Sequence, residues 1–143
     1  MRLNLDHTKK ISLKTTEKEI NKMPEKIKIL IVDDEYAFCK SLKAFLEKHD
    51  YRITFTTSGE HALDLIKEEQ PALMTLDIRM PGLNGYEVLQ KAKWISDKMI
   101  IIIISAIDVP NMVDSLKHKG AHAVFNKPID LERLLKSIRE LTA

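Results

Sequence analysis

The sequence predicts an α/β protein in which a five-stranded parallel sheet is doubly wound, with helices on both faces. Short apolar runs alternate with amphipathic stretches five times between Ile27 and Leu141, which is the pattern of repeated βα units. Two of the runs, 27–32 and 99–104, show no alternation with polar residues, as strands buried on both faces should. We therefore expect a single domain over residues 27–141.

The expected strands are short apolar runs bounded by polar or turn-forming residues. They span 27–32, 51–56, 72–76, 99–104 and 121–125. The run at 51–56 carries Arg52, Thr54 and Thr56, so we place it at an edge of the sheet. The two uninterrupted apolar runs belong at its centre.

The expected helices have apolar residues three and four positions apart, which gives each helix one buried face. They span 35–49, 59–69, 84–94, 109–119 and 130–141. The last helix shows the spacing clearly, at Leu131, Leu134, Leu135, Ile138 and Leu141. Trp94 ends the third helix, where it is either a packing residue or a surface contact.

The N-terminal segment, residues 1–26, is polar and Lys-rich, with seven basic and four acidic residues. We expect a tail or linker, the alternative being a short helix of a preceding module. Residues 27–143 hold 16 basic and 17 acidic residues. The body therefore lacks the basic footprint of a nucleic-acid-binding domain, and no direct nucleic-acid partner is expected.

Cysteine content and hydropathy indicate in which cellular compartment the protein resides. Cys39 is the single cysteine, so an internal disulfide is impossible and a reducing environment is expected. The longest apolar run, Met99 to Ile104, is far shorter than the roughly 20 residues of a membrane helix. The N-terminus also lacks the apolar region of a signal peptide. We expect a cytoplasmic protein without membrane insertion.

Polar side chains stand where the expected strands end. Doubly wound sheets bind ligands outside the carboxyl ends of their strands, and the residues there are Asp33, Asp34, Asp77, Ser105 and Lys127. Two like charges about 4 Å apart repel by roughly 4 kcal/mol at an effective dielectric near 20. A cluster of three carboxylates therefore implies a counter-cation, and Mg²⁺ fits because it takes a few carboxylate oxygens together with water and phosphate oxygens.

A metal held at this edge leaves Asp77 free to act as a carboxylate nucleophile that forms an acyl phosphate. Lys127 would then neutralise a phosphoryl oxygen, and the Ser105 hydroxyl would donate to another. Pro128 follows Lys127, and an X-Pro bond prefers trans by only ~0.5–1 kcal/mol. We expect a cis bond here that directs the lysine across the sheet.

Four motifs carry a family resemblance: "ILIVDDE" at 29–35, "LDIRMPGLNGYEVL" at 76–89, "IIISA" at 102–106 and "NKPID" at 126–130. In this order and spacing the sequence resembles the receiver domains of two-component response regulators and is similar to the small chemotaxis regulator. The resemblance spans residues 27–141, essentially the whole expected fold. It implies a (βα)5, flavodoxin-like sheet with strand order 2-1-3-4-5.

The resemblance also implies a function. Asp77 would be phosphorylated by a phosphohistidine of a sensor histidine kinase or a histidine phosphotransfer protein. Mg²⁺ would be held by Asp33, Asp34, Asp77 and the backbone carbonyl of Arg79. The new charge would shift the surface built by residues 109–141, which contacts a downstream effector. Such a domain catalyses its own phosphorylation and dephosphorylation and is not a conventional enzyme.

The sequence departs from the family pattern in two places, which affect the expected output mechanism and the expected rate of dephosphorylation. The family usually has Tyr or Phe three residues before the lysine, and this sequence has Val124 there. Phe125 should point to the opposite face of the strand, so it belongs to the core and does not replace the missing ring. Arg79 and Ile107 occupy the positions where the family tunes dephosphorylation, and this bulky pair is expected to hinder attack by water.

The sequence also bears on alternative functions. The chain ends two residues after the last expected helix, so we expect a stand-alone regulator or relay, or a receiver excised from a hybrid kinase or larger regulator. A phosphatase of the aspartyl-phosphate type would place a D-x-D-x-T/V motif after the first strand, and "DDEYA" lacks it. A degenerate receiver that acts only as a binding surface remains the alternative. The two aspartates could also merely cap a helix, and Asp77 could merely form a turn.

Overall fold

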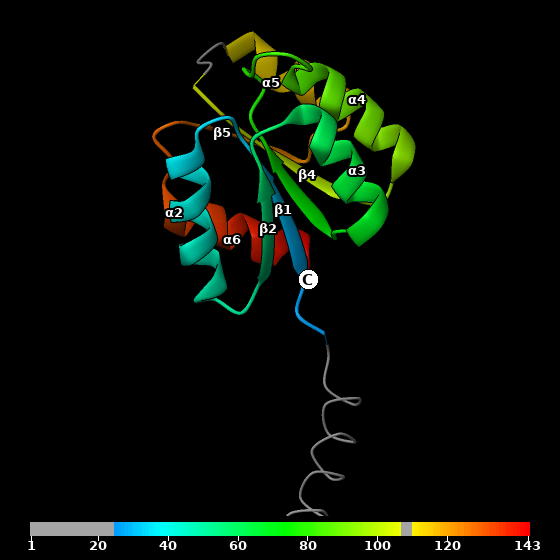
Figure 1. Cartoon of the computed structure of the whole chain (residues 1–143). Helices are drawn as coiled ribbons and strands as arrows, with labels where there is room; N and C mark the ends of the chain where they lie inside the picture. The colour runs from blue at the N-terminus through cyan, green and yellow to red at the C-terminus, as the bar shows by residue number, and fades with distance from the viewer. Residues whose placement is uncertain (1–24, 107–109) are drawn as a thin grey trace, which may run out of the picture.

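The five strands form one parallel sheet in the order β2-β1-β3-β4-β5, which confirms the predicted topology. The structure is a computed structural model that describes residues 25–106 and 110–143 (Figure 1). The strands are β1 Lys28–Val32, β2 Arg52–Thr56, β3 Leu73–Leu76, β4 Ile100–Ser105 and β5 Ala123–Asn126. All but the last two residues of the expected N-terminal tail, 1–26, lie outside the described residues.

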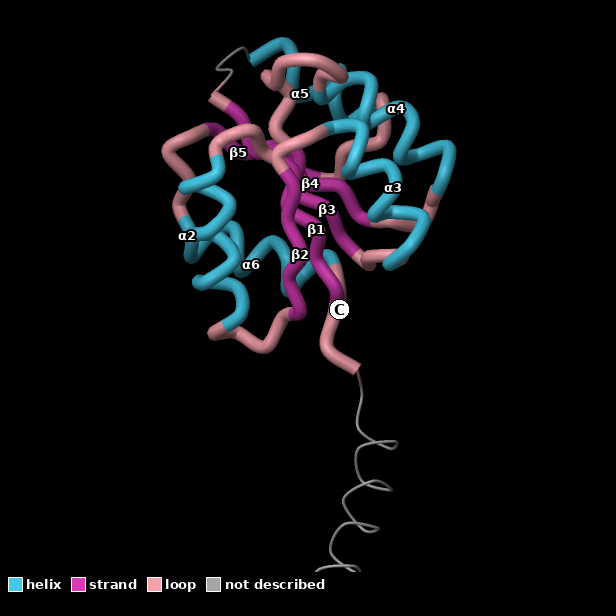
Figure 2. Tube along the Cα trace, in the orientation of Figure 1, coloured by secondary structure: helices cyan, strands magenta, loops and turns pink. Residues whose placement is uncertain are grey.

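A helix follows each strand, and the helices cover both faces of the sheet. They are α2 Tyr36–Glu47, α3 Gly59–Glu69, α4 Gly85–Ile95, α5 Pro110–His118 and α6 Leu131–Leu141. Helices α2 and α6 lie on one face, whereas α3, α4 and α5 lie on the other (Figures 1 and 2). Across the described ranges, no helix combines the length and the apolar character needed to cross a bilayer.

The alternation of side chains along the central strand β1 divides the core into two layers. Ile29 and Ile31 pack with α2 and α6, and Leu30 and Val32 pack with α3 and α4. All four are essentially buried, as expected for a strand covered on both faces. Strand β4 lies between β3 and β5, and β2 forms an edge, so the predicted central and edge positions are confirmed.

Three helices begin at polar side chains that the sequence supplies for this purpose. Ser58 accepts a hydrogen bond from the His61 N–H at the start of α3. Asn84 does the same for α4 and Asp130 for α6, each accepting from an N–H three residues further on. Such caps pair backbone donors that the first turn of a helix leaves without partners. They therefore fix where the loops at the carboxyl edge of the sheet end.

Strand β5 confirms the predicted alternation of Val124 and Phe125. Val124 packs against the core layer beneath α3, α4 and α5. Phe125 packs against the layer beneath α2 and α6, where the Arg133 guanidinium lies 5.9 Å from its ring centroid. The ring of Phe125 is therefore on the other side of the sheet from the position of Val124, and it cannot replace a ring there.

Candidate functional site

The carboxyl edge of the sheet carries the predicted site residues because the hydrogen-bond ladder runs one residue past the strands. The Asp33 N–H donates to the Thr56 carbonyl at 3.2 Å, and the Asp77 N–H donates to the Val32 carbonyl at 3.0 Å. The Lys127 N–H likewise donates to the Ser105 carbonyl at 2.9 Å. The backbone of the site is therefore as firmly held as the sheet itself.

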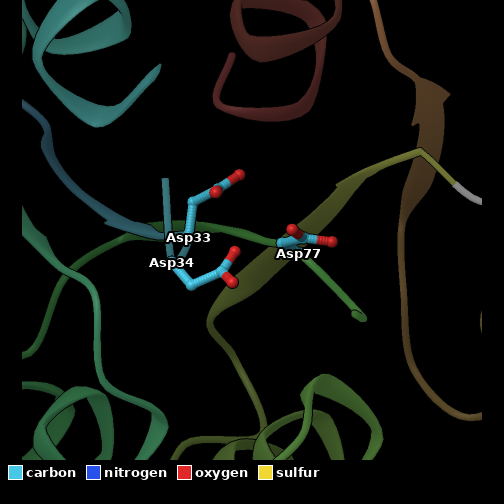
Figure 3. A group of neighbouring side chains, drawn as sticks. All are labelled: Asp33, Asp34 and Asp77. Carbon is cyan, nitrogen blue, oxygen red and sulfur yellow. The ribbon is translucent and has the colours of Figure 1, made fainter. Parts of the chain in front are cut away.

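Three carboxylates meet at this edge. Ligand oxygens of Asp33, Asp34 and Asp77 all lie within 4.8 Å of one another. Figure 3 shows Asp33 and Asp34 side by side after β1, with Asp77 next to them at the end of β3. Asp33 and Asp77 are buried, at 1% and 5% exposure, whereas Asp34 is exposed. The site thus has a buried floor and one acid that faces solvent.

Asp77 is held through one of its two carboxylate oxygens. Its Oδ1 accepts hydrogen bonds from the Ser105 hydroxyl at 2.8 Å and from the Arg79 N–H at 3.0 Å. The bond from the Arg79 N–H is the Asx turn expected of a turn-forming aspartate. Asp77 therefore does form a turn, and the same turn fixes the carboxylate beside Ser105 and the other two acids.

Lys127 is the cation of the site. Its Nζ lies 2.6 Å from Glu35 Oε1, 2.8 Å from Asp33 Oδ2 and 3.6 Å from Asp77 Oδ2. Burial alone would lower the pKa of Lys127, but its hydrogen bonds to Asp33 and Glu35 outweigh that effect and raise the pKa. The Lys127–Pro128 peptide bond is cis, as predicted. The lysine is thus a fixed positive charge among the acids.

Asp33 is the most deeply buried acid of the cluster. Burial raises the pKa of Asp33, while its contacts with Lys127 and with the Glu35 N–H act in the opposite direction. The first residue of α2, Tyr36, follows Glu35, and no side chain caps that helix. The two aspartates are therefore not a helix cap, which excludes the simplest structural explanation of the pair.

The donor set fits Mg²⁺. This ion prefers hard oxygen ligands, and one or two carboxylates commonly hold it together with water and phosphate oxygens. Asp33, Asp34 and Asp77 supply three such carboxylates at one point, and only Lys127 balances their charge among the described contacts. A divalent cation would relieve the remaining like-charge repulsion.

The loop between Asp77 and α4 is closed by a glycine. The Gly85 N–H donates to the Ile78 carbonyl at 3.0 Å. A Cβ at Gly85 would lie 2.4 Å from the Asp77 carbonyl oxygen and 2.3 Å from the Ile78 Cα. Both neighbours are backbone, so only glycine fits without moving the residue that carries the candidate nucleophile.

Two residues of the site had no role in the sequence analysis. Glu35 binds the Lys127 ammonium, and the Phe38 ring lies 4.4 Å from the same ammonium. Glu35 directly follows the aspartate pair in the sequence, and this adjacency is the only sequence signal for its place in the site. Phe38 lies one helical turn further along, with no signal at all. Arg79 is exposed, and Ile107 lies outside the described residues.

Together these side chains form a small anion and metal site around a buried carboxylate. Asp77 has Ser105 as a donor and Lys127 as a cation within 4 Å. An anion placed on Asp77 Oδ2 would lie near both groups, because they approach from the neighbouring strands β4 and β5. The arrangement suits transfer of a phosphoryl group to Asp77.

Comparisons with known proteins match most of the chain to one family. A model of the response regulator receiver domain matches residues 29–139. Sporulation initiation phosphotransferase F of Bacillus subtilis is 34% identical over 113 residues, covering 79% of this chain and 91% of that protein. PilH of Pseudomonas aeruginosa is 33% identical over 118 residues, covering 81% of this chain and 98% of that protein. Response regulator MprA of Mycolicibacterium vanbaalenii is 36% identical, but the match covers 80% of this chain and 50% of that protein.

Solved structures share the fold. The signal receiver domain of a putative LuxO repressor from Vibrio parahaemolyticus superposes with a TM-score of 0.77 at 26% identity, covering 81% of this chain and 89% of that one. A CheY-like receiver domain protein from Methanospirillum hungatei gives a TM-score of 0.76 at 30% identity, covering 80% and 92%.

Proposed function

The chain belongs to the response regulator receiver domain family, and on that premise we propose that it is the phosphoacceptor of a two-component phosphorelay. Asp77 is the residue that receives the phosphoryl group. One observation carries the proposal: the Asp77 carboxylate shares one edge of the sheet with two further acids, a hydroxyl and a lysine. A binding module that does no chemistry would need none of these groups at this spacing.

The step transfers a phosphoryl group from a histidine to an aspartate. A lone pair of an Asp77 carboxylate oxygen forms the new P–O bond, the P–N bond of the donor phosphohistidine breaks, and its electron pair returns to the imidazole nitrogen. Asp77 Oδ1 is already engaged by Ser105 and by the Arg79 N–H. Oδ2 is therefore the oxygen that we assign as the nucleophile.

Mg²⁺ would be held by Asp33, Asp34 and Asp77, with the Arg79 backbone carbonyl as a further ligand. When bound, it supplies positive charge that offsets the charge on the phosphoryl oxygens. Lys127 and Ser105 would supply the other interactions with the phosphoryl oxygens. Lys127, whose ammonium contacts both Asp33 and Asp77, contributes a second positive charge, and Ser105 contributes a hydroxyl donor.

Strands β4 and β5, at whose ends Ser105 and Lys127 stand, would transmit the effect of phosphorylation to the rest of the domain. Ser105 ends β4, and Lys127 directly follows β5. Both would exchange carboxylate contacts for phosphoryl contacts, which shifts a two-state equilibrium of the 109–141 surface toward one conformation. Val124 takes the place of the usual ring on β5, so the output does not depend on a rotating aromatic side chain. The partners are a sensor histidine kinase or histidine phosphotransfer protein and a downstream effector protein or domain.

Incubation with Mg²⁺ and acetyl phosphate, followed by intact-mass measurement, tests the proposal. We expect a gain of one phosphoryl group that disappears with EDTA and with Asp77→Asn. Asp64→Asn is the matched control, since Asp64 is an exposed acid on α3. Phosphorylation of Asp77→Asn, or a folded protein that gains no phosphoryl group, would contradict the proposal and leave the domain as a binding surface.

A further inference from the structure

Trp94 is an unpartnered aromatic side chain at the C-terminal end of α4. It is 91% exposed, more than any other large hydrophobic residue in the described ranges. Tyr36 is also exposed, at 60%, but its ring contacts Phe55 and lies under Lys40. Within the described ranges, Trp94 makes no hydrogen bond and no ring or cation contact. Tryptophan is enriched among the residues that dominate binding energy in protein interfaces, so this exposure calls for an explanation.

The tryptophan borders a groove between α3 and α4, which pack side by side (Figures 1 and 2). The groove has a volume of about 620 Å³. It is lined by Leu63, Lys67, Gln90, Lys91, Trp94 and Ile95. Leu63 and Ile95 are half-buried and pack against the core below. The groove therefore has an apolar floor and an aromatic wall, the features that seat one side of an amphipathic helix.

The charged residues of the groove are both basic. Lys67 from α3 and Lys91 from α4 line it, and no carboxylate does. Both lysines are exposed, so their ammonium groups are available to a ligand. Electrostatic complementarity therefore selects an occupant with acidic residues flanking its apolar side chains.

Charge also argues against two occupants from this protein itself. Residues 1–26 carry seven basic and four acidic residues, so that segment would bring positive charge to Lys67 and Lys91. A second copy docked through the same groove by two-fold symmetry would face like residues across the interface, which places lysines near lysines. Nucleic acid is disfavoured because residues 27–143, with 16 basic and 17 acidic residues, provide no broad positive field.

We propose that this groove is a docking site for an acidic amphipathic helix of another protein. An apolar side chain of the helix packs between Trp94 and the floor, and its carboxylates pair with Lys67 and Lys91. The site lies apart from the phosphorylation site. Gly85, at the N-terminal end of α4, contacts Ile78 just after Asp77, whereas Trp94 is near the other end of the helix. Docking therefore adds a contact surface separate from the 109–141 output surface.

A display selection tests the proposal directly. A library of helical peptides of about 15 residues, roughly four turns, is selected on the immobilised full chain and depleted on its Trp94→Ala variant. We expect peptides rich in Asp and Glu with apolar residues three and four positions apart. Trp94 is the single tryptophan, so a bound peptide should shift its emission to shorter wavelength and protect it from acrylamide quenching.

Variants separate the groove from the rest of the surface. We expect Trp94→Ala, and the double reversal Lys67→Glu with Lys91→Glu, each to weaken peptide binding about tenfold or more. The matched control is Lys48→Glu with Lys136→Glu, which reverses two exposed lysines on the α2 and α6 side and should leave binding unchanged. Phosphorylation of Trp94→Ala by acetyl phosphate should equal that of the wild type, which shows that the variant is folded whether or not peptide binding is lost.

Four results would overturn the proposal. The first is a selection that yields no peptide able to distinguish the wild type from Trp94→Ala. The second is selected peptides that are basic or that retain affinity for the lysine-reversal variant. The third is sedimentation that reveals a dimer abolished by Trp94→Ala, which would assign the groove to a second copy. The fourth is a change in Trp94 emission on titration with a DNA or RNA oligonucleotide, which would assign the groove to nucleic acid.

Discussion

The ammonium of Lys127 lies 2.6 Å from the carboxylate of Glu35, although the two residues are 92 positions apart in the chain. The same ammonium is 3.6 Å from Asp77 Oδ2. The Lys127 ammonium therefore lies closer to Glu35 than to the proposed phosphoacceptor. A phosphoryl group on Asp77 must compete with Glu35 for this cation, which makes Glu35 a positioning residue for the reaction.

Replacing Glu35 by Gln should raise the fraction of protein phosphorylated at steady state. The variant keeps the size of the side chain but removes the charge that competes for Lys127. Glu35 is 63% exposed in this ion pair, and exposed ion pairs contribute about 0.2–1 kcal/mol, so we expect an increase of up to about fivefold. Intact-mass measurement over a series of acetyl phosphate concentrations gives the fraction.

Glu47→Gln is the matched control for this change. Glu47 pairs with Lys43 at 4.0 Å on the exposed surface of α2, away from Asp77, so its removal should not alter the phosphorylated fraction. A Glu35→Gln protein whose phosphorylated fraction equals or falls below that of the wild type would show that Glu35 does not restrain Lys127.

The site could be predicted from the sequence to the extent that the backbone alone determines it. Parallel strands end at one edge, so short apolar runs were enough to bring Asp33, Asp77, Ser105 and Lys127 together. The contact of Lys127 with Glu35 could not be predicted in this way. It depends on how far a flexible side chain reaches across the sheet and on which rotamer it adopts, and neither leaves a pattern in the sequence.

The environment of Trp94 on α4 is a second feature that the sequence pattern could not predict. Its position at the end of an amphipathic stretch fitted either a packing residue or a surface contact. The structure shows a surface residue, at 91% exposure. The buried residues of α4 are Gly85, Val88, Leu89 and Ala92, and Trp94 lies on the opposite face of the helix. Trp94 is also near the end of α4, where the following loop could cover it, and hydrophobic periodicity carries no information on the path of a loop.

Mg²⁺ should raise the thermal stability of the protein, and Asp34→Asn should remove most of that effect. A ligand that binds only the folded state stabilises it by mass action. Asp34 is exposed, so its replacement should not disturb the core. Without metal the variant should melt at or above the wild-type temperature, because one of three clustered negative charges is gone. Thermal unfolding with and without MgCl2 measures both effects.

Asp97→Asn, at an exposed acid after α4, is the control and should show the full Mg²⁺ effect. If Asp34→Asn gains as much stability from Mg²⁺ as the wild type does, the metal is bound elsewhere and the three carboxylates are not its site.

Gly85→Ala should impair both folding and phosphorylation. The added Cβ would overlap the backbone of Asp77 and Ile78, which can only be relieved by moving the loop. Overpacking of this kind costs about 1–3 kcal/mol of unfolding free energy, and the displaced Asp77 should be phosphorylated more slowly. Urea unfolding and the acetyl phosphate reaction measure the two losses. Gln90→Ala, at an exposed position of the same helix, should change neither, and a fully active Gly85→Ala protein would refute the steric argument.

Stability should fall as the pH drops below about 6.5, in part because of His122. Its Nδ1 accepts a hydrogen bond from the Ile101 N–H at 3.1 Å, which requires that nitrogen to be unprotonated. Although the residue is exposed overall, partial desolvation of the ring, together with the charge of Lys93, lowers the pKa of His122 from its ordinary value of 6.5. The unfolded chain therefore takes up a proton at a higher pH than the folded protein does. The contribution of His122 is complete above the unfolded pKa and is lost as the pH falls through the range below it.

His122→Gln isolates this contribution, because Gln offers an acceptor oxygen that does not titrate in this range. Urea unfolding between about pH 7.5 and about pH 5.5, on either side of the ordinary histidine pKa, should show a shallower loss of unfolding free energy in the variant than in the wild type. His118→Gln, at an exposed position near the end of α5, should keep the wild-type slope. Equal slopes for His122→Gln and the wild type would mean that the pKa of His122 is the same in the folded and the unfolded protein. His122 would then not link the stability of the sheet to pH.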